Sequence, residues 1–387
     1  MSKLLARIGY LVSRAEKYLP LGGVGPFLSG PDHLRTFQRR TRQLYWRNKP
    51  WRMLRWPLTI TTHALWLGIF LAKGRLRPIG SDTCKMRARI AWDVAVGGKT
   101  PGEARLHLLG FPDQSRSIIP QRTASTALRL LGSPASKSLL NDKLRMGNLM
   151  QERGIPTPPT LVELASLSDL RTFLASRSET DDLFAKARRG SGGKDALRLP
   201  SGRLDLPTLA ALADILRRDS ILVQPFIQSS SQFAAISNVP PVLRVTTFRP
   251  VNGEPIILDS YLSVFAPDRP AADWRSGAVR FPIDPRSGML LPGCWFAQPK
   301  ERFEALPWNE LHMAGRQMDR FDQACEASLK AAEIVPDLPL VGWDIIPGES
   351  GPLLLEGNWG LHWLLSHLWH IESGQHPVST RALLDWG

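Results

Sequence analysis

The pattern of hydrophobic and polar positions changes part-way along this chain. Residues 1–130 contain apolar segments with helical spacing, broken at residues 20–25, 30–31, 57 and 97–102, where glycine and proline cluster. From about Ser136 onward, short β-branched runs alternate with helical patterns. We therefore predict a mainly helical region over residues 1–132, followed by an α+β domain over residues 133–387.

Within the second region the pattern predicts the order of the elements. We expect helices over residues 141–153, 206–218 and 313–334, and strands over residues 183–187, 221–227, 242–249, 255–265, 278–283, 289–296, 340–346 and 352–357. Turn sequences join three pairs of these strands, at Asn252 and Gly253, at residues 284–288 and at residues 347–351. These turns predict antiparallel hairpins.

The last hairpin carries two acids and an amide. A turn centred near Ser350 places Asp344 opposite Glu356, and Asn358 shares the face of Glu356 because side chains two apart on a strand point the same way. Two carboxylates on one face repel each other unless a cation lies between them, and oxygen ligands of this kind suit Mg²⁺. The alternative is a pair of solvent-facing acids on an edge hairpin, but the apolar residues 353–355 favour a buried one.

Basic residues and glycines lie upstream of this hairpin. The strand that carries Lys186 leads into a glycine-rich loop whose main-chain N–H groups can approach phosphate oxygens. The loop consists of Gly190, Ser191, Gly192, Gly193 and Lys194. Lys143 lies in a helix that Gly154 closes, and a solvated helix face is the ordinary explanation for such a lysine. Arg244 stands in the middle of a strand, where a buried arginine requires an anionic partner, and phosphate is the natural candidate.

The strand over residues 221–227 ends in a proline-containing segment, Gln224, Pro225, Phe226 and Ile227. Because proline interrupts the ladder of a sheet, main-chain groups there stay available, as recognition of an adenine edge requires.

Taken in order, these segments resemble the ATP-grasp superfamily and, more narrowly, the sugar-transfer-associated ATP-grasp family. The likeness covers about residues 133–368. The segments that carry it are Asn141-Asp142-Lys143, Phe184-Ala185-Lys186 with the glycine-rich loop, Val223 followed by the proline-containing segment, Leu243-Arg244-Val245-Thr246, Trp343-Asp344 and Glu356-Gly357-Asn358.

The resemblance implies an ATP-grasp fold of two α+β subdomains that grip ATP, residues 133–222 with a lid and residues 223–387 with a magnesium site. It implies that Lys143 and Lys186 bind the ATP phosphates, that residues 190–194 form the lid and that residues 224–227 hold adenine. Arg244 and Lys186 would act in catalysis. The Mg²⁺ ligands would be Asp344, Glu356 and Asn358.

The resemblance also implies an activity. ATP-grasp enzymes usually phosphorylate a carboxylate to an acylphosphate, which an amine or occasionally a thiol then attacks. We therefore expect an ATP- and Mg²⁺-dependent ligase in saccharide, polysaccharide or related metabolite biosynthesis, with a small-molecule or saccharide-linked acceptor. A small-molecule kinase on the same fold and a nucleotide-binding, membrane-associated scaffold stay open as alternatives. Trp274, Trp295 and Trp308 are candidates for stacking on a sugar, although most tryptophans pack in cores and interfaces.

Charge adds an expectation about partners. The chain carries 49 Lys and Arg against 35 Asp and Glu, a net charge of +14. Residues 1–56 hold much of this excess, which suits an anionic surface. We expect peripheral contact with an anionic membrane there and no nucleic-acid partner; a merely solvated basic surface is the alternative. The apolar residues 57–72 are shorter than the ~20 needed to span a bilayer, so we expect a buried or interfacial helix.

Cysteine usage bears on location. The three cysteines are far apart and form no CxxC pair, which argues against a disulfide framework or a structural zinc site and fits a reducing cytoplasm.

Overall fold

A computed structural model of the chain describes residues 39, 43, 121–178, 180, 182–190, 195–202, 204–234, 236, 239–266, 278–295 and 298–359. Gly132–Leu361 is one unit, and Met1–Leu131 with His362–Gly387 is another. Helix α6 (Gln121–Leu130) belongs to the latter. Apart from residues 39 and 43, which are helical, the basic segment 1–56 and the apolar segment 57–72 lie outside the described residues.

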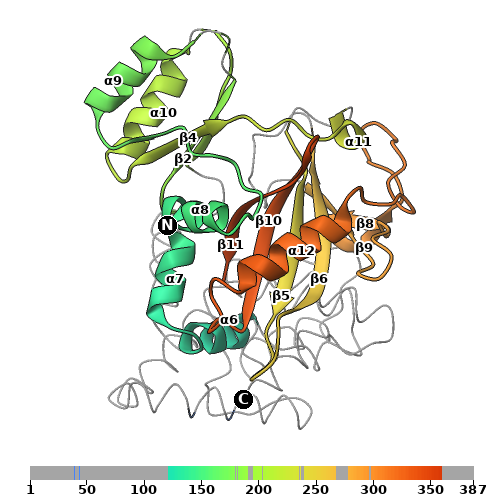
Figure 1. Cartoon of the computed structure of the whole chain (residues 1–387). Coiled ribbons are helices and arrows are strands. Elements are labelled where there is room, and N and C mark those ends of the chain that lie inside the picture. Colours follow the sequence, from blue (N-terminus) through green and yellow to red (C-terminus); the bar gives the residue numbers. More distant parts are fainter. Residues whose placement is uncertain are drawn as a thin grey trace, which may run out of the picture. The chain divides into compact units, whose positions relative to one another are not determined.

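The first sheet has four antiparallel strands in the order β1-β4-β2-β3. Its strands are β1 (Val162–Leu164), β2 (Leu183–Ala187), β3 (Ala196–Leu199) and β4 (Ile221–Pro225). Helices α9 (Leu167–Ser176) and α10 (Leu206–Leu216) pack against one of its faces (Figure 1). Leu183, Ala185 and Val223 fill the core beneath these helices. Since side chains alternate along a strand, residues 184, 186, 222 and 224 lie on the opposite face.

The second sheet has seven antiparallel strands in the order β11-β10-β5-β6-β7-β8-β9. They are β5 (Val242–Phe248), β6 (Ile256–Phe265), β7 (Ala278–Pro282), β8 (Gly293–Trp295), β9 (Gln298–Phe303), β10 (Leu340–Gly348) and β11 (Gly351–Asn358). Helix α12 (Phe321–Ala332) lies across one face (Figure 1). The short helix α11 (Ser231–Ala234) follows the first sheet.

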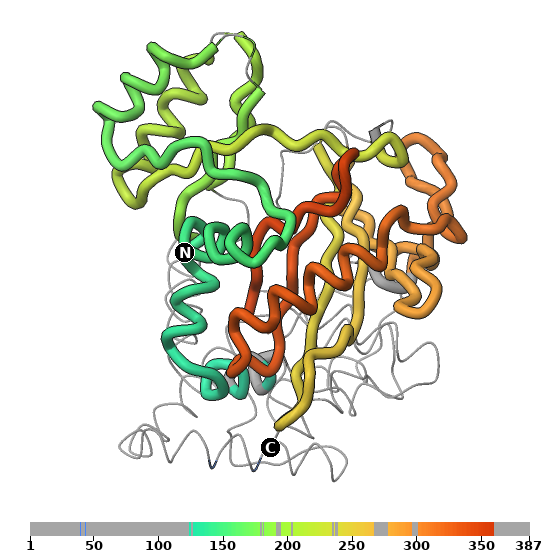
Figure 2. Tube along the Cα trace, viewed as in Figure 1, coloured from blue at the N-terminus to red at the C-terminus, as the bar shows by residue number. Residues whose placement is uncertain are grey.

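Two helices that precede the first sheet in the sequence pack against the last strand of the second. Helices α7 (Pro134–Asn141) and α8 (Lys143–Glu152) lie beside β11, as the neighbouring teal and red segments of Figure 2 show. The N–H of Leu354 donates to the carbonyl of Pro156 at 2.8 Å, which ties the chain after α8 to β11. Residues 141–156 are therefore held against the hairpin with the two acids.

The seven-stranded sheet has one apolar and one polar face. Leu243, Val245, Trp343 and Ile345 are fully buried and belong to the core that includes α12. The indole N–H of Trp343 donates to the hydroxyl of Thr247 at 2.9 Å, so its polar atom is satisfied inside the core. The alternate positions on the same strands point to the other face, and Arg244, Thr246 and Asp344 give the middle of that face its polar side chains.

The α+β class and the predicted order of elements are confirmed, but several boundaries differ. The helix predicted over residues 313–334 begins only at Phe321, because Gly315 and Arg320 have positive φ angles of 80° and 54° and the N–H of Leu290 donates to the carbonyl of Arg316 at 2.9 Å. The helix predicted over residues 141–153 is interrupted at Asp142, which ends α7 and caps α8.

Other predicted elements are shorter than expected. The strands over residues 221–227 and 289–296 and the helix over 206–218 cover only β4, β8 and α10. The subdomain boundary predicted between residues 222 and 223 falls inside β4, which belongs to the first sheet along its whole length.

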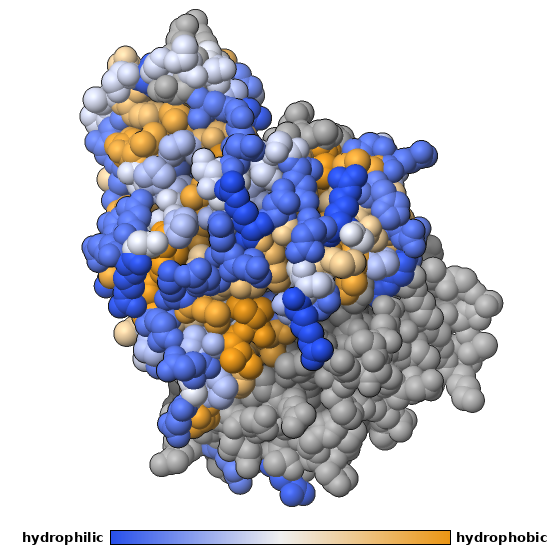
Figure 3. All heavy atoms as spheres, turned by 45° about the vertical axis from the view of Figure 1, so that its right-hand side comes forward, coloured by the Kyte–Doolittle hydropathy of each residue, from blue (hydrophilic) through white to orange (hydrophobic). Residues whose placement is uncertain are grey.

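Among the described residues, every helix is too short or too polar to cross a bilayer. Figure 3 shows the molecule turned by 45° from the view of Figure 1. On the face seen there, hydrophilic residues cover much of the described surface, and apolar residues form separate areas between them.

Candidate active site

A row of polar side chains crosses the polar face of the seven-stranded sheet. Tyr261 on β6 is opposite Arg244 on β5, and Arg244 is in turn opposite Asp344 on β10. Asp344 is also opposite Glu356 on β11. Directly opposed residues of antiparallel strands share a face, so the four side chains lie side by side. The pairing of Asp344 with Glu356 that the sequence predicts is confirmed.

This pairing depends on a bulge that the sequence does not reveal. Near the turn, Gly348 pairs with Gly351 and Ile345 with Leu354, and this register alone would align Asp344 with Leu355. The register shifts between Asp344 and Ile345, which leaves Leu355 without an opposite partner. The extra residue brings Glu356 onto the face of Asp344, and with it Asn358.

The three predicted metal ligands converge on one point. The side-chain amide nitrogen of Asn358 is 3.0 Å from Oδ2 of Asp344 and 3.3 Å from Oε1 of Glu356. Half a turn of this amide places its oxygen at the same position, beside both carboxylates. The set therefore fits a small cation that takes oxygen ligands. Among the described residues, no cluster of three or more His, Cys, Asp or Glu could hold a metal, and the role of Asp344, Glu356 and Asn358 as metal ligands stays a prediction.

Arg244 is the counter-ion of this carboxylate pair. Its Nε and Nη2 donate to Oδ1 and Oδ2 of Asp344 at 2.6 and 2.9 Å, with the two side chains 19% and 16% exposed. The sequence suggested phosphate as the anionic partner of Arg244, and in the structure that partner is Asp344. Burial raises the pKa of Asp344, with Glu356 acting in the same direction, although the guanidinium of Arg244 opposes it.

The two predicted phosphate-binding lysines lie close to Glu356. Lys143, the first residue of α8, donates from Nζ to the carbonyl of Gly190 at 2.7 Å and lies 3.7 Å from Oε2 of Glu356. Lys186 on β2 is 8% exposed. Burial lowers its pKa to about 8, although the charge of Glu356 acts to raise it. The structure thus brings Lys143, Lys186 and Glu356 together from three separate elements.

The glycine-rich loop is described only at its first residue. Gly190 has a φ of 126°, a conformation that L side chains rarely adopt, which explains a glycine there. Ser191, Gly192, Gly193 and Lys194 lie outside the described residues. Their part in binding phosphate stays a prediction.

The predicted adenine segment is partly occupied by contacts within the chain. The side chain of Gln224 donates to the carbonyl of Pro158 at 3.2 Å, and the N–H of Phe226 donates to the carbonyl of Asp182 at 2.9 Å. The expectation that Pro225 leaves the neighbouring main-chain groups available is therefore wrong for the N–H of Phe226, since that N–H continues the contact between β4 and the start of β2. The adenine role of residues 224–227 stays a prediction.

Several polar residues of this sheet face were not predicted from the sequence. Thr246 is opposite Asp259, and Ser263 is opposite Arg280, so all four extend the row that holds Arg244. Arg280 is 4% exposed, and its guanidinium lies 5.7 Å from the ring centre of Tyr261. Burial lowers the pKa of Arg280. Polar residues at alternate positions of the strand over residues 256–265 are the signal that could have identified this face.

Comparisons with known proteins add little to this geometry. The sequence matches no protein-family model and no curated protein. Among solved structures, the chain is similar to VanG D-Ala:D-Ser ligase from Enterococcus faecalis, with a TM-score of 0.42 and 13% identity over 65% of this chain and 61% of that one. A biotin carboxylase from Campylobacter jejuni gives a TM-score of 0.45 and 13% identity over 69% and 52%.

A third similar structure is the ATP-grasp ligase PsnB, with a TM-score of 0.37 and 16% identity over 72% of this chain and 71% of that one. This chain spans 61% of the length of the first of these proteins and 52% of the second. Similarities with TM-scores this low are too weak to assign a function. The chemistry of the site is therefore inferred from this chain's own residues.

Proposed function

We propose that this chain is an ATP-grasp enzyme that binds ATP with Mg²⁺ and joins a carboxylate to an amine or thiol. One observation carries the proposal. Asp344, Glu356 and Asn358 converge on one point of the polar sheet face, and Lys143 and Lys186 lie close to Glu356. A small oxygen-liganded cation beside two lysines suits the binding of a nucleoside triphosphate.

The reaction has two transfers. An oxygen of the substrate carboxylate attacks the γ-phosphorus of ATP, and the bond from that phosphorus to ADP breaks. The nitrogen of the amine then attacks the carbonyl carbon of the acylphosphate and loses a proton, and inorganic phosphate leaves. Neither transfer needs a nucleophilic side chain, because positioning and neutralisation of charge supply most of the catalysis.

The chain's residues have separate roles in these transfers. Asp344, Glu356 and Asn358 would hold Mg²⁺, which when bound neutralises charge on the phosphate oxygens. Lys143 and Lys186 would bind phosphate oxygens beside this metal site. Arg244, which makes a bidentate pair with Asp344 in this structure, would contact the transferred phosphoryl group.

The acceptor, the partners and the location belong to the proposal as well. We place the acceptor in saccharide or polysaccharide biosynthesis on the strength of the sequence resemblance. The cytoplasm is proposed as the location because the three distant cysteines suit a reducing compartment. Trp295 and Trp308, whose ring centres are 6.1 Å apart, are partly exposed candidates for stacking on a sugar, although both also pack against the core. Trp274 lies outside the described residues. The basic segment 1–56 is proposed to contact an anionic membrane.

The test is ATP turnover against pools of acceptors. Wild-type protein with Mg²⁺, ATP, carboxylates and amines should release ADP and phosphate only when both kinds of acceptor are present. Glu356→Ala should release neither. ADP with a stable phosphorylated product in the absence of amine would show a kinase instead, and no nucleotide turnover or binding in any mixture would refute the enzyme proposal.

A further inference from the structure

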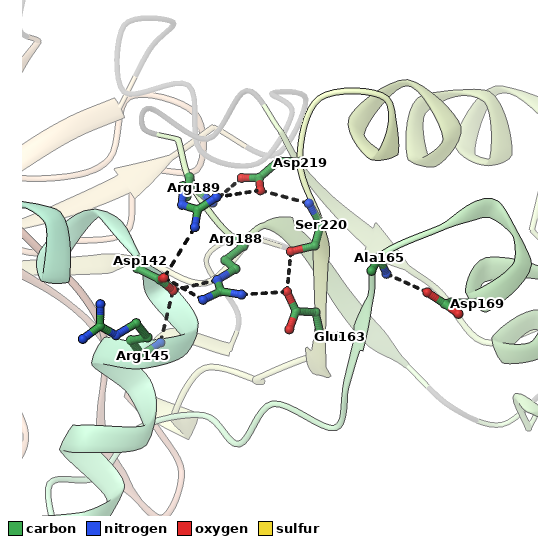
Figure 4. A network of polar contacts seen from close by, with 9 residues as sticks. All are labelled: Asp142, Arg145, Glu163, Ala165, Asp169, Arg188, Arg189, Asp219 and Ser220. Carbon is green, nitrogen blue, oxygen red and sulfur yellow. Dashed lines mark hydrogen bonds and ion pairs between the residues drawn. The ribbon is translucent and has the colours of Figure 1, made fainter.

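The start of the glycine-rich loop is held by a network of charged side chains outside the proposed metal site (Figure 4). Arg188, directly after β2, donates from Nε and Nη2 to the two oxygens of Asp142 at 2.8 and 2.7 Å. Its remaining nitrogen, Nη1, donates to Glu163 on β1 at 3.1 Å, and Glu163 also accepts from the hydroxyl of Ser220. Through Asp142 and Glu163, one guanidinium therefore links the N-cap of α8 to β1 and to the segment before β4.

The main chain of Arg188 joins the same neighbours. Its carbonyl accepts from the N–H of Lys143 at 3.1 Å, and its N–H donates to the carbonyl of Ser220 at 2.9 Å. The next residue is held too, because the N–H of Arg189 donates to Asp219 at 2.6 Å. Both the backbone and the side chain of Arg188 thus fix where the loop leaves the sheet.

Asp142 joins this network to the helix that carries Lys143. Its Oδ1 accepts from the N–H of Arg145 at 3.2 Å and caps α8, and its side chain is 7% exposed. The hydrogen bonds from Arg188 lower the pKa of Asp142, which keeps the carboxylate ionised. Because Lys143 follows directly, the orientation of Asp142 sets where the first turn of α8 and its lysine point.

We propose that Asp142 and Arg188 are positioning residues for the ATP phosphates, acting through Lys143 and Gly190. This inference rests on the proposed function. The bidentate pair holds the start of α8 against the end of β2, so that the ammonium of Lys143 stands between the carbonyl of Gly190 and the carboxylate of Glu356. On this proposal neither positioning residue would itself contact the nucleotide.

The decisive variant is Asp142→Asn. Asparagine caps a helix about as well as aspartate, so the bond to the N–H of Arg145 is kept while the charge and one acceptor for Arg188 are lost. Arg188→Lys is the second variant, since lysine keeps the charge but cannot make the two parallel bonds. Glu333→Gln is the matched control, because it removes an ion pair with Arg249 (2.6 Å) at the end of α12.

The experiment measures dissociation constants for ATP and for adenosine by calorimetry, with thermal unfolding of each variant alongside. Loss of the residues that orient metal ligands typically costs about 10–100-fold in metal affinity or activity, and we expect a loss of this order in ATP affinity for Asp142→Asn and Arg188→Lys. Adenosine, which has no phosphate, should bind as it does to wild type. Glu333→Gln should bind both ligands like wild type.

Each contrary outcome has a separate meaning. Unchanged ATP affinity in either folded variant would overturn the positioning role, and so would a parallel loss of ATP and adenosine binding, which would show a general loss of structure. If one variant fails to fold, the other decides. If wild-type protein itself binds no ATP, the proposed function fails first and the inference fails with it.

Discussion

Lys186 is a buried cation that costs the folded protein stability. Its side chain is 8% exposed, and burial lowers its pKa from 10.5 to about 8. At about 1.4 kcal/mol per pKa unit, this lowering corresponds to about 3 kcal/mol. At pH 7 the ammonium is charged in both the folded and the unfolded chain, so the folded state carries the whole cost.

Lys186→Met should therefore raise the free energy of unfolding at pH 7 by up to about 3 kcal/mol while it removes ATP binding. Between pH 8 and 10.5 the unfolded chain holds a proton that the folded chain has released, so wild-type stability rises with pH and the advantage of the variant shrinks. Urea unfolding of both proteins at neutral and alkaline pH measures this difference.

Lys330→Met is the control for this prediction. Lys330 is an exposed residue of α12 that pairs with Glu326, so its replacement should change the unfolding free energy by no more than about 0.5 kcal/mol. The reasoning is refuted if Lys186→Met is no more stable than wild type at pH 7, or if its advantage persists unchanged at alkaline pH.

Three further predictions follow from the site and from the charge of the chain. Arg244→Gln removes the counter-ion of Asp344, so Mn²⁺ alone should bind more tightly in electron paramagnetic resonance titrations. The affinity for Mg·ATP should fall by about tenfold or more, and a fall in both affinities would contradict this prediction. Gly357→Ala should cost about 1–3 kcal/mol in urea unfolding, because its Cβ would lie 2.5 Å from Cζ3 of Trp343, whereas Gly147→Ala in the open interior of α8 should not destabilise. Deletion of residues 1–56 should abolish co-sedimentation with vesicles that contain phosphatidylserine, and binding that survives the deletion would place the membrane contact elsewhere.

Much of the fold follows from local sequence signals. The β10–β11 hairpin could be predicted because its turn and its polar positions are neighbours in the chain, and α8 because Gly154 closes it with a φ of 66°. The pairing of β1 with β4 and of β10 with β5 could not, since these strands are far apart in sequence and nothing local records which edges meet.

The sequence predicts which residues form the candidate site better than it predicts the contacts between them. Asp344 and Glu356 stand out as acids on apolar strands, but the bulge at Leu355 that aligns them has no mark in the sequence. Arg244 was expected to face phosphate because phosphate is the usual partner of a buried arginine in such a site. The structure pairs it with Asp344, a residue one hundred positions away, through a strand pairing that the sequence does not show.

The most direct measurement of the central claim is the dependence of ATP binding on Mg²⁺ in Glu356→Gln. Glu349→Gln, at the turn of the same hairpin, is the matched control, because Glu349 is an exposed acid that accepts from the N–H of Ser231 at 2.7 Å. We predict that wild type and Glu349→Gln bind ATP tightly only with Mg²⁺, and that Glu356→Gln loses this dependence together with most of its affinity. Equal affinity and equal Mg²⁺ dependence in all three proteins would contradict a metal site at Asp344, Glu356 and Asn358.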